Sequence, residues 1–394
     1  MKLKTTVLFA AIAAVTTTSA FAQQTRVFNI TGATAFRASS NNAIIQLLGG
    51  TGVTEFAFTG DSGIDGSNRA LFVGTLSAFP GDTVIVRTSW SGSTAGILNL
   101  ADANPIEFLT IDNPVSTNGT NLGEQGNPAP IFENAVARWS FSDVDQLLSE
   151  RPNAPLAGGP VGVVPFMFLA GEGAPAALNN MTDQLHNTLW STGQIPISFF
   201  TGDTSDPTTI LATGRNNGSG TRATILAETQ YGAFTNVVQF NATFEGERTD
   251  PYPTGRLLAI SEFGNGGNSS NSGVRELLTR RADDATFGGD PVDILFVSYL
   301  TISDALAAIS EGAQEMTYNG VPFSAENVKN GRYSLWGYQQ FYLGANPTAD
   351  EQTFDFAFRQ AIPNTLDGVN AIAITEMEAD RVGGDGGPIF PGQP

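Results

Sequence analysis

The chain repeats one local pattern: a short apolar run, a loop of glycine and small hydroxyl residues, and then a helix-like segment. The pattern occurs at residues 26–48, 83–100, 135–150 and 209–228. Short apolar runs bounded by glycine and serine favour buried strands, and the segments that follow them favour helices. Strands that alternate with helices predict an α/β fold. Ligands of such folds bind beyond the carboxyl ends of the strands, where we expect these loops to meet.

Length and composition limit the architecture. The chain has 394 residues, of which 41% are hydrophobic, and it contains no cysteine. A chain of this length is too long for one typical core and is expected to form two domains. Because neither disulfides nor cysteine-bound metals are available, packing alone has to stabilise the fold.

The N-terminus has the composition of a secretory signal peptide. Lys2 and Lys4 precede an apolar stretch at 7–15, and an Ala-x-Ala cleavage site ends at Ala22. Without cysteine there is no lipobox, and no other run approaches the ~20 apolar residues that span a bilayer. We therefore expect a signal peptide at 1–22 and a periplasmic or secreted protein.

The charge is strongly acidic. The formal net charge is −19, and Lys329 is the only lysine beyond the expected signal peptide. This composition argues against nucleic acid and anionic membranes as partners, because both require basic surfaces. A local anion site is still possible, because dipoles and a single arginine act at ~3 Å, whereas salt screens surface charge beyond ~8–10 Å.

One loop by itself predicts a ligand-binding site. The segment GRNNGSGTR at 214–222 lies between a strand-like run at 209–212 and a helix-like run that begins at Ala223. Such a turn offers free backbone N–H groups, hydroxyl donors and the positive end of a helix dipole. Arg215 adds a fixed charge that can donate two parallel hydrogen bonds. The loop therefore predicts a site for an oxyanion, most simply phosphate.

Three further loops share this character, and the four occur in a fixed order. They are GATAF at 32–36, GSTAG at 92–96, FSD at 141–143 and RNNGSGT at 215–221. In sequence and order they resemble the ligand loops of the phosphate-binding proteins of bacterial phosphate ABC transporters. The resemblance implies a type 2 periplasmic binding protein fold, an α/β fold of two lobes with mixed sheets and a cleft between the lobes.

The resemblance also implies lobe boundaries, site residues and partners. Lobe one would comprise residues 23–155 and 334–394, and lobe two residues 156–333. The protein would be a monomer without enzymatic activity, metal or cofactor, and it would deliver its ligand to a membrane ABC permease. The implied ligand contacts are Thr34, Phe36, Ser93, Asp143, Arg215, Ser219, Gly220 and Thr221, with Thr94 and Asn217 in supporting positions.

Two positions at which this sequence differs from the family bear on the specificity for the anion. The family has an aspartate that pairs with the arginine of its loop, and Asn217 stands at that position here. Asp112 competes with Asp143 for the carboxylate role, and we favour Asp143 because the apolar segment 161–166 follows it as the family's next strand does. That carboxylate would accept a hydrogen bond from protonated phosphate and repel sulfate, which has no proton to donate.

Several other residues are assigned structural roles. His186, the only histidine, lies at helical spacing and is expected at a surface or half-buried helix position. The acidic loop at 61–66 departs from a calcium loop at two positions, so a metal is not expected there. Arg37 and Arg222 are expected to be solvated residues at helix starts. Four aromatic residues are expected in the core and hinge strand: Trp336, Tyr338, Phe341 and Tyr342.

The sequence therefore predicts an exported, non-enzymatic protein that binds phosphate or a similar tetrahedral oxyanion, with ABC-type uptake as its role. The alternative is a secreted surface or matrix protein that keeps the binding-protein fold and has lost or changed its ligand. The acidic charge, Asn217 and a loop-rich insertion at 113–130 leave this alternative open.

Overall fold

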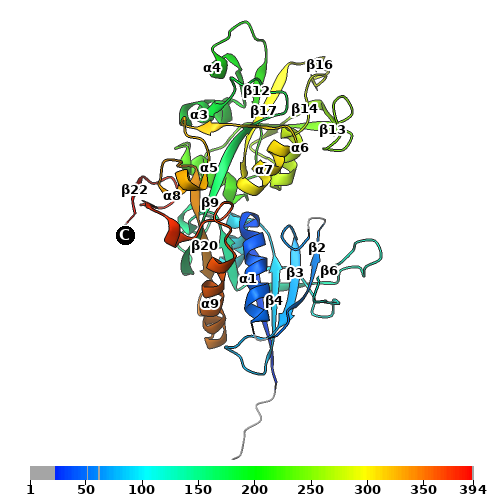
Figure 1. Ribbon diagram of the computed structural model, residues 1–394, viewed down its shortest axis with the longest axis vertical. Coiled ribbons are helices and arrows are strands. Elements are labelled where there is room, and N and C mark those ends of the chain that lie inside the picture. The colour runs from blue at the N-terminus through cyan, green and yellow to red at the C-terminus, as the bar shows by residue number, and fades with distance from the viewer. Residues whose placement is uncertain (1–22, 51, 61–62, 393–394) are drawn as a thin grey trace, which may run out of the picture.

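The computed structural model describes residues 23–50, 52–60 and 63–392. Figure 1 shows two bodies stacked along the long axis of the molecule. The expected signal peptide at 1–22 and part of the acidic loop at 61–66 lie outside the described residues. In the part of the chain that the structure describes, no helix is long and apolar enough to cross a membrane.

One mixed sheet runs through both bodies. Its strands follow the order β11-β12-β17-β9-β20-β8-β1-β4-β3-β2-β6. Strand β9 (Ala157–Ala170) and strand β20 (Trp336–Leu343) pair antiparallel at its centre and carry the sheet from one body to the other. β1 pairs in parallel with both β4 and β8. The predicted α/β fold with mixed sheets is therefore confirmed.

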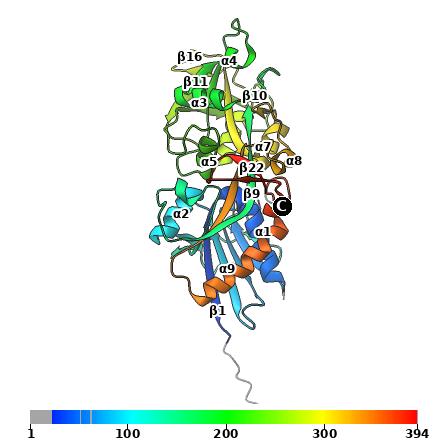
Figure 2. The same cartoon turned by 90° about the vertical axis from the view of Figure 1, so that its left-hand side faces the viewer.

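We call the body on the β20-to-β6 side of the sheet lobe one. Figure 2 shows α2 on one side of its sheet and α1 on the other. α9 packs beside α1 and begins with a capping box between Thr348 and Glu351. The strands of lobe one are β1 (Thr25–Gly32), β2 (Glu55–Thr59), β3 (Arg69–Gly74), β4 (Thr83–Ser89), β5 (Pro105–Leu109), β6 (Thr120–Asn121), β7 (Phe132–Val136) and β8 (Trp139–Ser142). Its helices are η1 (Thr34–Phe36), α1 (Arg37–Gly49), α2 (Ser93–Asp102), η2 (Gln146–Leu148), α9 (Ala349–Ala361) and η3 (Ile362–Thr365).

The other body is lobe two, in which α5, α6 and α7 flank the sheet (Figure 1). Its strands are β10 (Asn180–Met181), β11 (Gln194–Pro196), β12 (Thr209–Ala212), β13 (Gln239–Glu245), β14 (Arg256–Gly264), β15 (Thr286–Phe287), β16 (Asp290–Pro291), β17 (Ile294–Thr301), β18 (Gln314–Glu315) and β19 (Thr317–Tyr318). Its helices are α3 (Asp183–Thr192), α4 (Ser198–Thr201), α5 (Gly220–Glu228), α6 (Asn271–Leu278), α7 (Ile302–Ser310) and α8 (Ala325–Lys329). The chain ends in η4 (Ile374–Glu376), β21 (Ala379–Arg381) and β22 (Ile389–Pro391).

The hydrophobic core is continuous across the two lobes. One cluster of buried side chains includes Phe141 of β8, Phe166 of β9, Tyr299 of β17 and Trp336 of β20. A second cluster packs α6 and α7 against the sheet of lobe two. Because β9 and β20 contribute to both lobes, the lobe boundaries drawn from the sequence remain a proposal.

Three of the four repeated units have the predicted strand–loop–helix form, and one does not. The segment 135–141 divides between the ends of β7 and β8, and the helix expected at 144–150 is only the short η2. Asp145 accepts a hydrogen bond from the Leu147 backbone N–H, so the chain makes a capped turn there in place of a helix.

Candidate oxyanion-binding site

The four predicted ligand loops meet where strands from both lobes end. The backbone N–H of Gly92 donates to the carbonyl of Gly32 at 2.9 Å, and Ala33 donates to Phe141 at 2.9 Å. A Cβ on Gly92 would lie 2.9 Å from the carbonyl oxygen of Gly218, which belongs to lobe two. The turns that follow β1, β4 and β8 therefore touch the turn that follows β12.

Asp143 lies at the centre of this meeting point. Its side chain is buried, and hydroxyl donors from both lobes hold its carboxylate. Ser93 of lobe one donates to Oδ1, and Thr221 of lobe two donates to Oδ2 at 3.2 Å. Thr224 also donates to the backbone carbonyl of Asp143 at 2.7 Å. The carboxylate thus joins the N-termini of α2 and α5.

Burial raises the pKa of Asp143, although the hydrogen bond from Ser93 and the charge of Arg215 oppose the change. A carboxyl group in this environment holds a proton more readily than an exposed aspartate does. In its ionised form the carboxylate can accept a hydrogen bond from a protonated oxyanion. Asp112, the competing candidate, is exposed in the segment after β5.

Gly220 allows the two lobes to approach this closely. A Cβ at this position would lie 1.7 Å from Oδ1 of Asp143 and 2.3 Å from Oγ of Ser93. Only glycine therefore fits at the first residue of α5. The buried Ser219 caps the helix by accepting a hydrogen bond from the backbone N–H of Arg222 at 3.3 Å.

Arg215 is buried and is held by neutral acceptors. Its guanidinium donates to the side-chain oxygen of Asn271 at 2.7 Å and to the backbone carbonyls of Ser269 at 3.0 Å and Asn268 at 3.3 Å. Burial lowers the pKa of Arg215, and the nearby charge of Asp143 opposes the change. Among the described residues, no carboxylate forms an ion pair with this guanidinium.

The loop at 265–273 therefore has a function that sequence reasoning missed. Its glycine- and asparagine-rich composition predicts flexibility. Its backbone and side-chain amide oxygens instead accept hydrogen bonds from two buried arginines, Arg215 and Arg222. Arg222 is only 5% exposed and donates to the carbonyl oxygens of Asn265 at 2.9 Å and Arg215 at 3.4 Å. The prediction that Arg222 is solvated is wrong, because this loop folds over it.

Asn217 does not contact Arg215 in the way that the resemblance implies for the residue at this position. It is exposed, and its side-chain oxygen accepts a hydrogen bond from Arg222 at 3.4 Å. Asn271, 56 residues further along the chain than Arg215, supplies the side-chain acceptor for that arginine. A run of asparagine and serine before a helix start is the only sequence signal for this partner.

Thr34 and Phe36 lie in η1 at the end of β1. The Phe36 ring is buried against Phe141, with 5.5 Å between the ring centroids. Within the described residues, neither Thr34 nor Phe36 forms a hydrogen bond with the carboxylate of Asp143. Thr94 instead lines a cavity of about 390 Å³ between α2 and the loop that carries Asn217.

The C-terminal strap, residues 379–392, lies where the two lobes meet (Figure 1). Arg381 forms an ion pair with Glu228 of α5 at 2.6 Å, and both side chains are 2% exposed. Asp385 accepts a hydrogen bond from the backbone N–H of Asp145 in lobe one at 2.6 Å. The strap therefore binds to both lobes.

The carboxyl groups around the strap have unusual proton affinities. Burial raises the pKa of Glu228, against the opposing charge of its ion-pair partner Arg381. Burial also raises the pKa of Asp385 to about 7, although the hydrogen bond from Asp145 opposes the change. Asp385 therefore releases its proton close to neutral pH.

His186 and the aromatic residues serve the core. The imidazole is fully buried and stacks on Trp190 with 4.4 Å between ring centroids, and burial lowers its pKa to about 4. The helix predicted for His186 is present as α3, but the expected surface or half-buried position is wrong. Trp336 and Phe341 are fully buried, as predicted. In the described ranges, no group of three or more acidic or histidine side chains could hold a metal ion.

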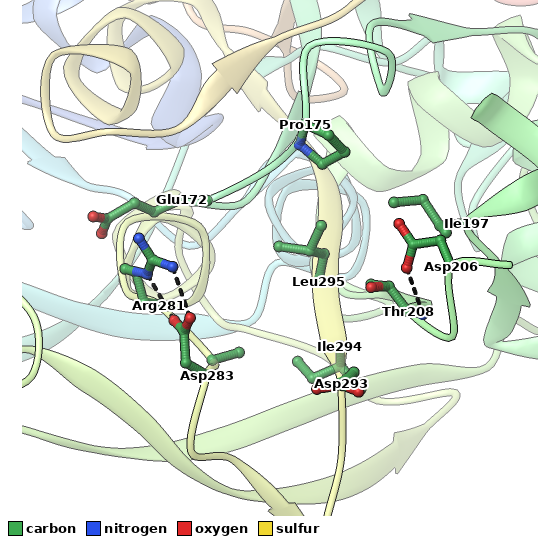
Figure 3. A pocket seen from close by; sticks show the side chains of 12 residues that line it. Glu172, Pro175, Ile197, Asp206, Thr208, Arg281, Asp283, Asp293, Ile294 and Leu295 are labelled. Carbon is green, nitrogen blue, oxygen red and sulfur yellow. Dashed lines mark hydrogen bonds and ion pairs between the residues drawn. The ribbon is translucent and has the colours of Figure 1, made fainter. Parts of the chain in front are cut away.

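Two other polar regions lie in lobe two. A cavity of about 300 Å³ is lined in part by Glu172, Asp206 and Arg281, and Arg281 forms an ion pair with Asp283 at 2.6 Å (Figure 3). This arginine is therefore already neutralised by a neighbour on its own loop.

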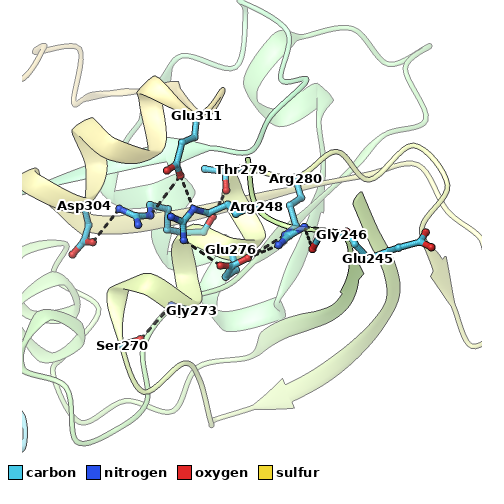
Figure 4. A network of polar contacts seen from close by, with 11 residues as sticks. Glu245, Gly246, Arg248, Ser270, Gly273, Glu276, Thr279, Arg280, Asp304 and Glu311 are labelled. Carbon is cyan, nitrogen blue, oxygen red and sulfur yellow. Dashed lines mark hydrogen bonds and ion pairs between the residues drawn. The ribbon is translucent and has the colours of Figure 1, made fainter. Parts of the chain in front are cut away.

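Figure 4 shows the second region, an ion-pair network that links α6 to α7. Arg248 lies 3.1 Å from Glu276 and 2.9 Å from Glu311. Arg275 pairs with Asp304 at 3.7 Å. The network fixes the two helices whose N-termini carry Asn271 and Asp304, and it thereby positions the acceptor of Arg215.

Comparison with known proteins identifies the fold. A putative phosphate ABC transporter substrate-binding protein with bound phosphate from Clostridium perfringens is 12% identical, with a TM-score of 0.51 over 89% of this chain and 100% of that chain. An ABC-type phosphate transport receptor from Vibrio cholerae is 12% identical, with a TM-score of 0.44 over 84% of this chain and 93% of the receptor. A mutant OxyR with bound hydrogen peroxide from Corynebacterium glutamicum is 8% identical, with a TM-score of 0.38 over 88% and 68% of the two chains.

The chain has the fold of type 2 periplasmic binding proteins, and at these identities the likeness shows the fold alone. No protein-family model matches the sequence, and no curated protein matches it either.

Proposed function

We propose that this chain is a non-enzymatic solute-binding protein that takes phosphate or a similar tetrahedral oxyanion between its lobes. The supporting observation is the convergence of donors from both lobes on one buried point. Ser93 and Thr221 donate to the carboxylate of Asp143, beside the buried Arg215. Hydroxyls, helix N-termini and an arginine without a carboxylate partner are the donors that a desolvated oxyanion requires.

The carboxylate of Asp143 now accepts the hydrogen bonds that the ligand would accept. On binding, Ser93 and Thr221 turn from this carboxylate to the oxygens of the anion, and the N-termini of α2 and α5 add backbone N–H groups. Asp143 then accepts a hydrogen bond from the P–O–H group of HPO₄²⁻. A sulfate ion has no proton to share, so the buried carboxylate disfavours it.

Uptake is the role that accompanies this site. The fold is that of proteins whose lobes close on a ligand, and a ligand that contacts both lobes favours the closed form. We propose that the protein is exported, acts as a monomer and delivers its ligand to a membrane ABC permease. The lobe boundaries at 155/156 and 333/334 remain part of this proposal.

Isothermal titration calorimetry tests the proposal directly. The chain that begins at Gln23 is freed of phosphate and titrated with phosphate and then with sulfate. Micromolar phosphate binding without sulfate binding is the expected result. A folded protein that takes up no phosphate at millimolar concentration contradicts the proposal.

The second candidate is a secreted surface or matrix protein with a lost or changed ligand. The ion pair between Arg381 and Glu228 and the hydrogen bond from Asp145 to Asp385 favour it, because they tie the strap to both lobes and resist opening. Small-angle scattering distinguishes the two functions. A transport protein becomes more compact when phosphate is added, whereas a locked protein keeps one radius of gyration.

A further inference from the structure

Arg37 is the one arginine beside the predicted site whose role the proposed function does not explain. It is the first residue of α1 and directly follows η1, and its side chain is half-buried. Among the described residues, its guanidinium has no hydrogen bond, ion pair or aromatic contact. The expectation that it is a solvated residue at a helix start does not fit this burial.

The charges around Arg37 place it opposite lobe two. Burial lowers the pKa of Arg37, and the charge of Asp304 in the first turn of α7 opposes the change. Burial also lowers the pKa of Arg215, and the charge of Arg37 lowers it further. Figure 1 shows α7 of lobe two above the end of α1. Arg215 is joined to the start of α7 through Asn271, which accepts a hydrogen bond from Arg215 at 2.7 Å and donates one to Thr301 at 2.9 Å. The two guanidinium groups therefore approach the start of α7 from different lobes.

Asp304 does not neutralise this pair of arginines. Its carboxylate pairs with Arg275 at 3.7 Å and accepts a hydrogen bond from Thr301 at 3.3 Å. The network in Figure 4 contains Arg248, Arg275 and Arg280 against Glu276, Glu311 and Asp304, so its own charges are balanced. The network therefore has no carboxylate to spare for Arg37 or Arg215.

Two partly desolvated guanidinium groups without an ion-pair partner are costly to keep together, and a bound anion removes this cost. Resting on the proposed function, we propose that Arg37 is a second cationic contact to the ligand, so that lobe one grips the oxyanion with Arg37 while lobe two grips it with Arg215. The site then binds the dianion HPO₄²⁻ more tightly than the monoanion H₂PO₄⁻. Because each lobe contributes one arginine, the charge of the ligand also draws the lobes together.

The test compares Arg37→Gln with the wild-type chain in calorimetric titrations with inorganic phosphate. Titrations at about pH 5 and about pH 8 lie on either side of the second ionisation of a phosphate group. Arg332→Gln is the matched control, because it removes the same charge from an exposed arginine of lobe two. Protein groups that titrate in this range are common to all variants, so the comparison between variants isolates the charge of the ligand.

We expect Arg37→Gln to weaken phosphate binding roughly 10- to 100-fold at the higher pH, the effect of losing one hydrogen bond to a charged group, and only a few-fold at the lower pH. Arg332→Gln should stay within about two-fold of the wild type at both. Arg37→Lys, which keeps the charge and loses the planar fork, should give an intermediate affinity at the higher pH and serves if Arg37→Gln fails to fold.

The outcomes separate this inference from the proposed function. If the wild type binds phosphate and both Arg37 variants match it, or lose the same factor at both pH values, the dianion contact is wrong and the proposed function stands. If the folded wild type binds no phosphate at either pH, both proposals are wrong.

Discussion

Gly220 carries the contact between the lobes, so Gly220→Ala is the most direct perturbation of the site. The added Cβ would lie 1.7 Å from Oδ1 of Asp143 and 2.3 Å from Oγ of Ser93, both inside van der Waals contact. The change does not oppose the helix, since alanine favours α5 by up to about 1 kcal/mol over glycine. Any loss therefore comes from the contact between the lobes.

The expected magnitude follows from the contacts that separate. Overpacking of a buried contact costs about 1–3 kcal/mol, and the hydrogen bonds from Ser93 and Thr221 to Asp143 contribute about 1 kcal/mol each. After the gain in helix propensity, the closed arrangement should lose roughly 2–4 kcal/mol relative to an open one. This corresponds to a loss of phosphate affinity of roughly 30- to 1,000-fold.

Small-angle scattering and phosphate titration measure both consequences. Gly218→Ala is the control in the same loop, because its Cβ would meet Asn216 at an ordinary 3.8 Å. We expect Gly220→Ala to have a larger radius of gyration and weak phosphate binding, whereas Gly218→Ala matches the wild type. A Gly220→Ala protein with wild-type compactness and affinity would refute the assignment of this contact to the closed state.

Three further predictions concern charge. Asp143→Asn should raise sulfate binding relative to phosphate in a competition titration, because the repulsive carboxylate is removed. Asp385 has its pKa raised from 3.8 to about 7, so the folded chain binds its proton more tightly and the free energy of unfolding should fall as pH rises through this window. Asp385→Asn should remove part of this fall, on the order of 2 kcal/mol, in urea unfolding. Asn271→Asp, which gives Arg215 a carboxylate partner, should stabilise the fold and weaken phosphate binding about tenfold.

Each of the three charge predictions has an outcome that contradicts it. Unchanged selectivity in Asp143→Asn shows that this carboxylate does not discriminate between the anions. An unfolding free energy with the same pH slope in Asp385→Asn assigns the slope to other groups, of which Glu228 is the first to examine. Phosphate affinity that survives Asn271→Asp shows that the uncompensated charge of Arg215 does not drive binding.

Local sequence signals predicted the elements that carry the site. Glycine turns, hydroxyl caps and strand-like apolar runs act over a few residues, so the ends of β1, β4 and β12 and the starts of α1, α2 and α5 could be located from the sequence. The same signals predicted that Ser93, Asp143 and Thr221 stand at loop ends of one α/β fold. Their hydrogen bonds across the lobes agree with that placement.

The tertiary structure decided how the charges of the site are compensated. Arg215 takes its side-chain acceptor from Asn271, Arg222 is buried under the loop at 265–273, and the C-terminal strap brings Asp385 to lobe one. Each of these contacts joins segments that are far apart in the chain, and no short pattern records which loop will cover a given arginine. The sequence by itself determined where hydrogen-bond donors occur along the chain. Whether a charged side chain is buried depends on how the whole chain packs. Only the tertiary structure therefore determined which charges these donors meet and how much free energy their desolvation costs.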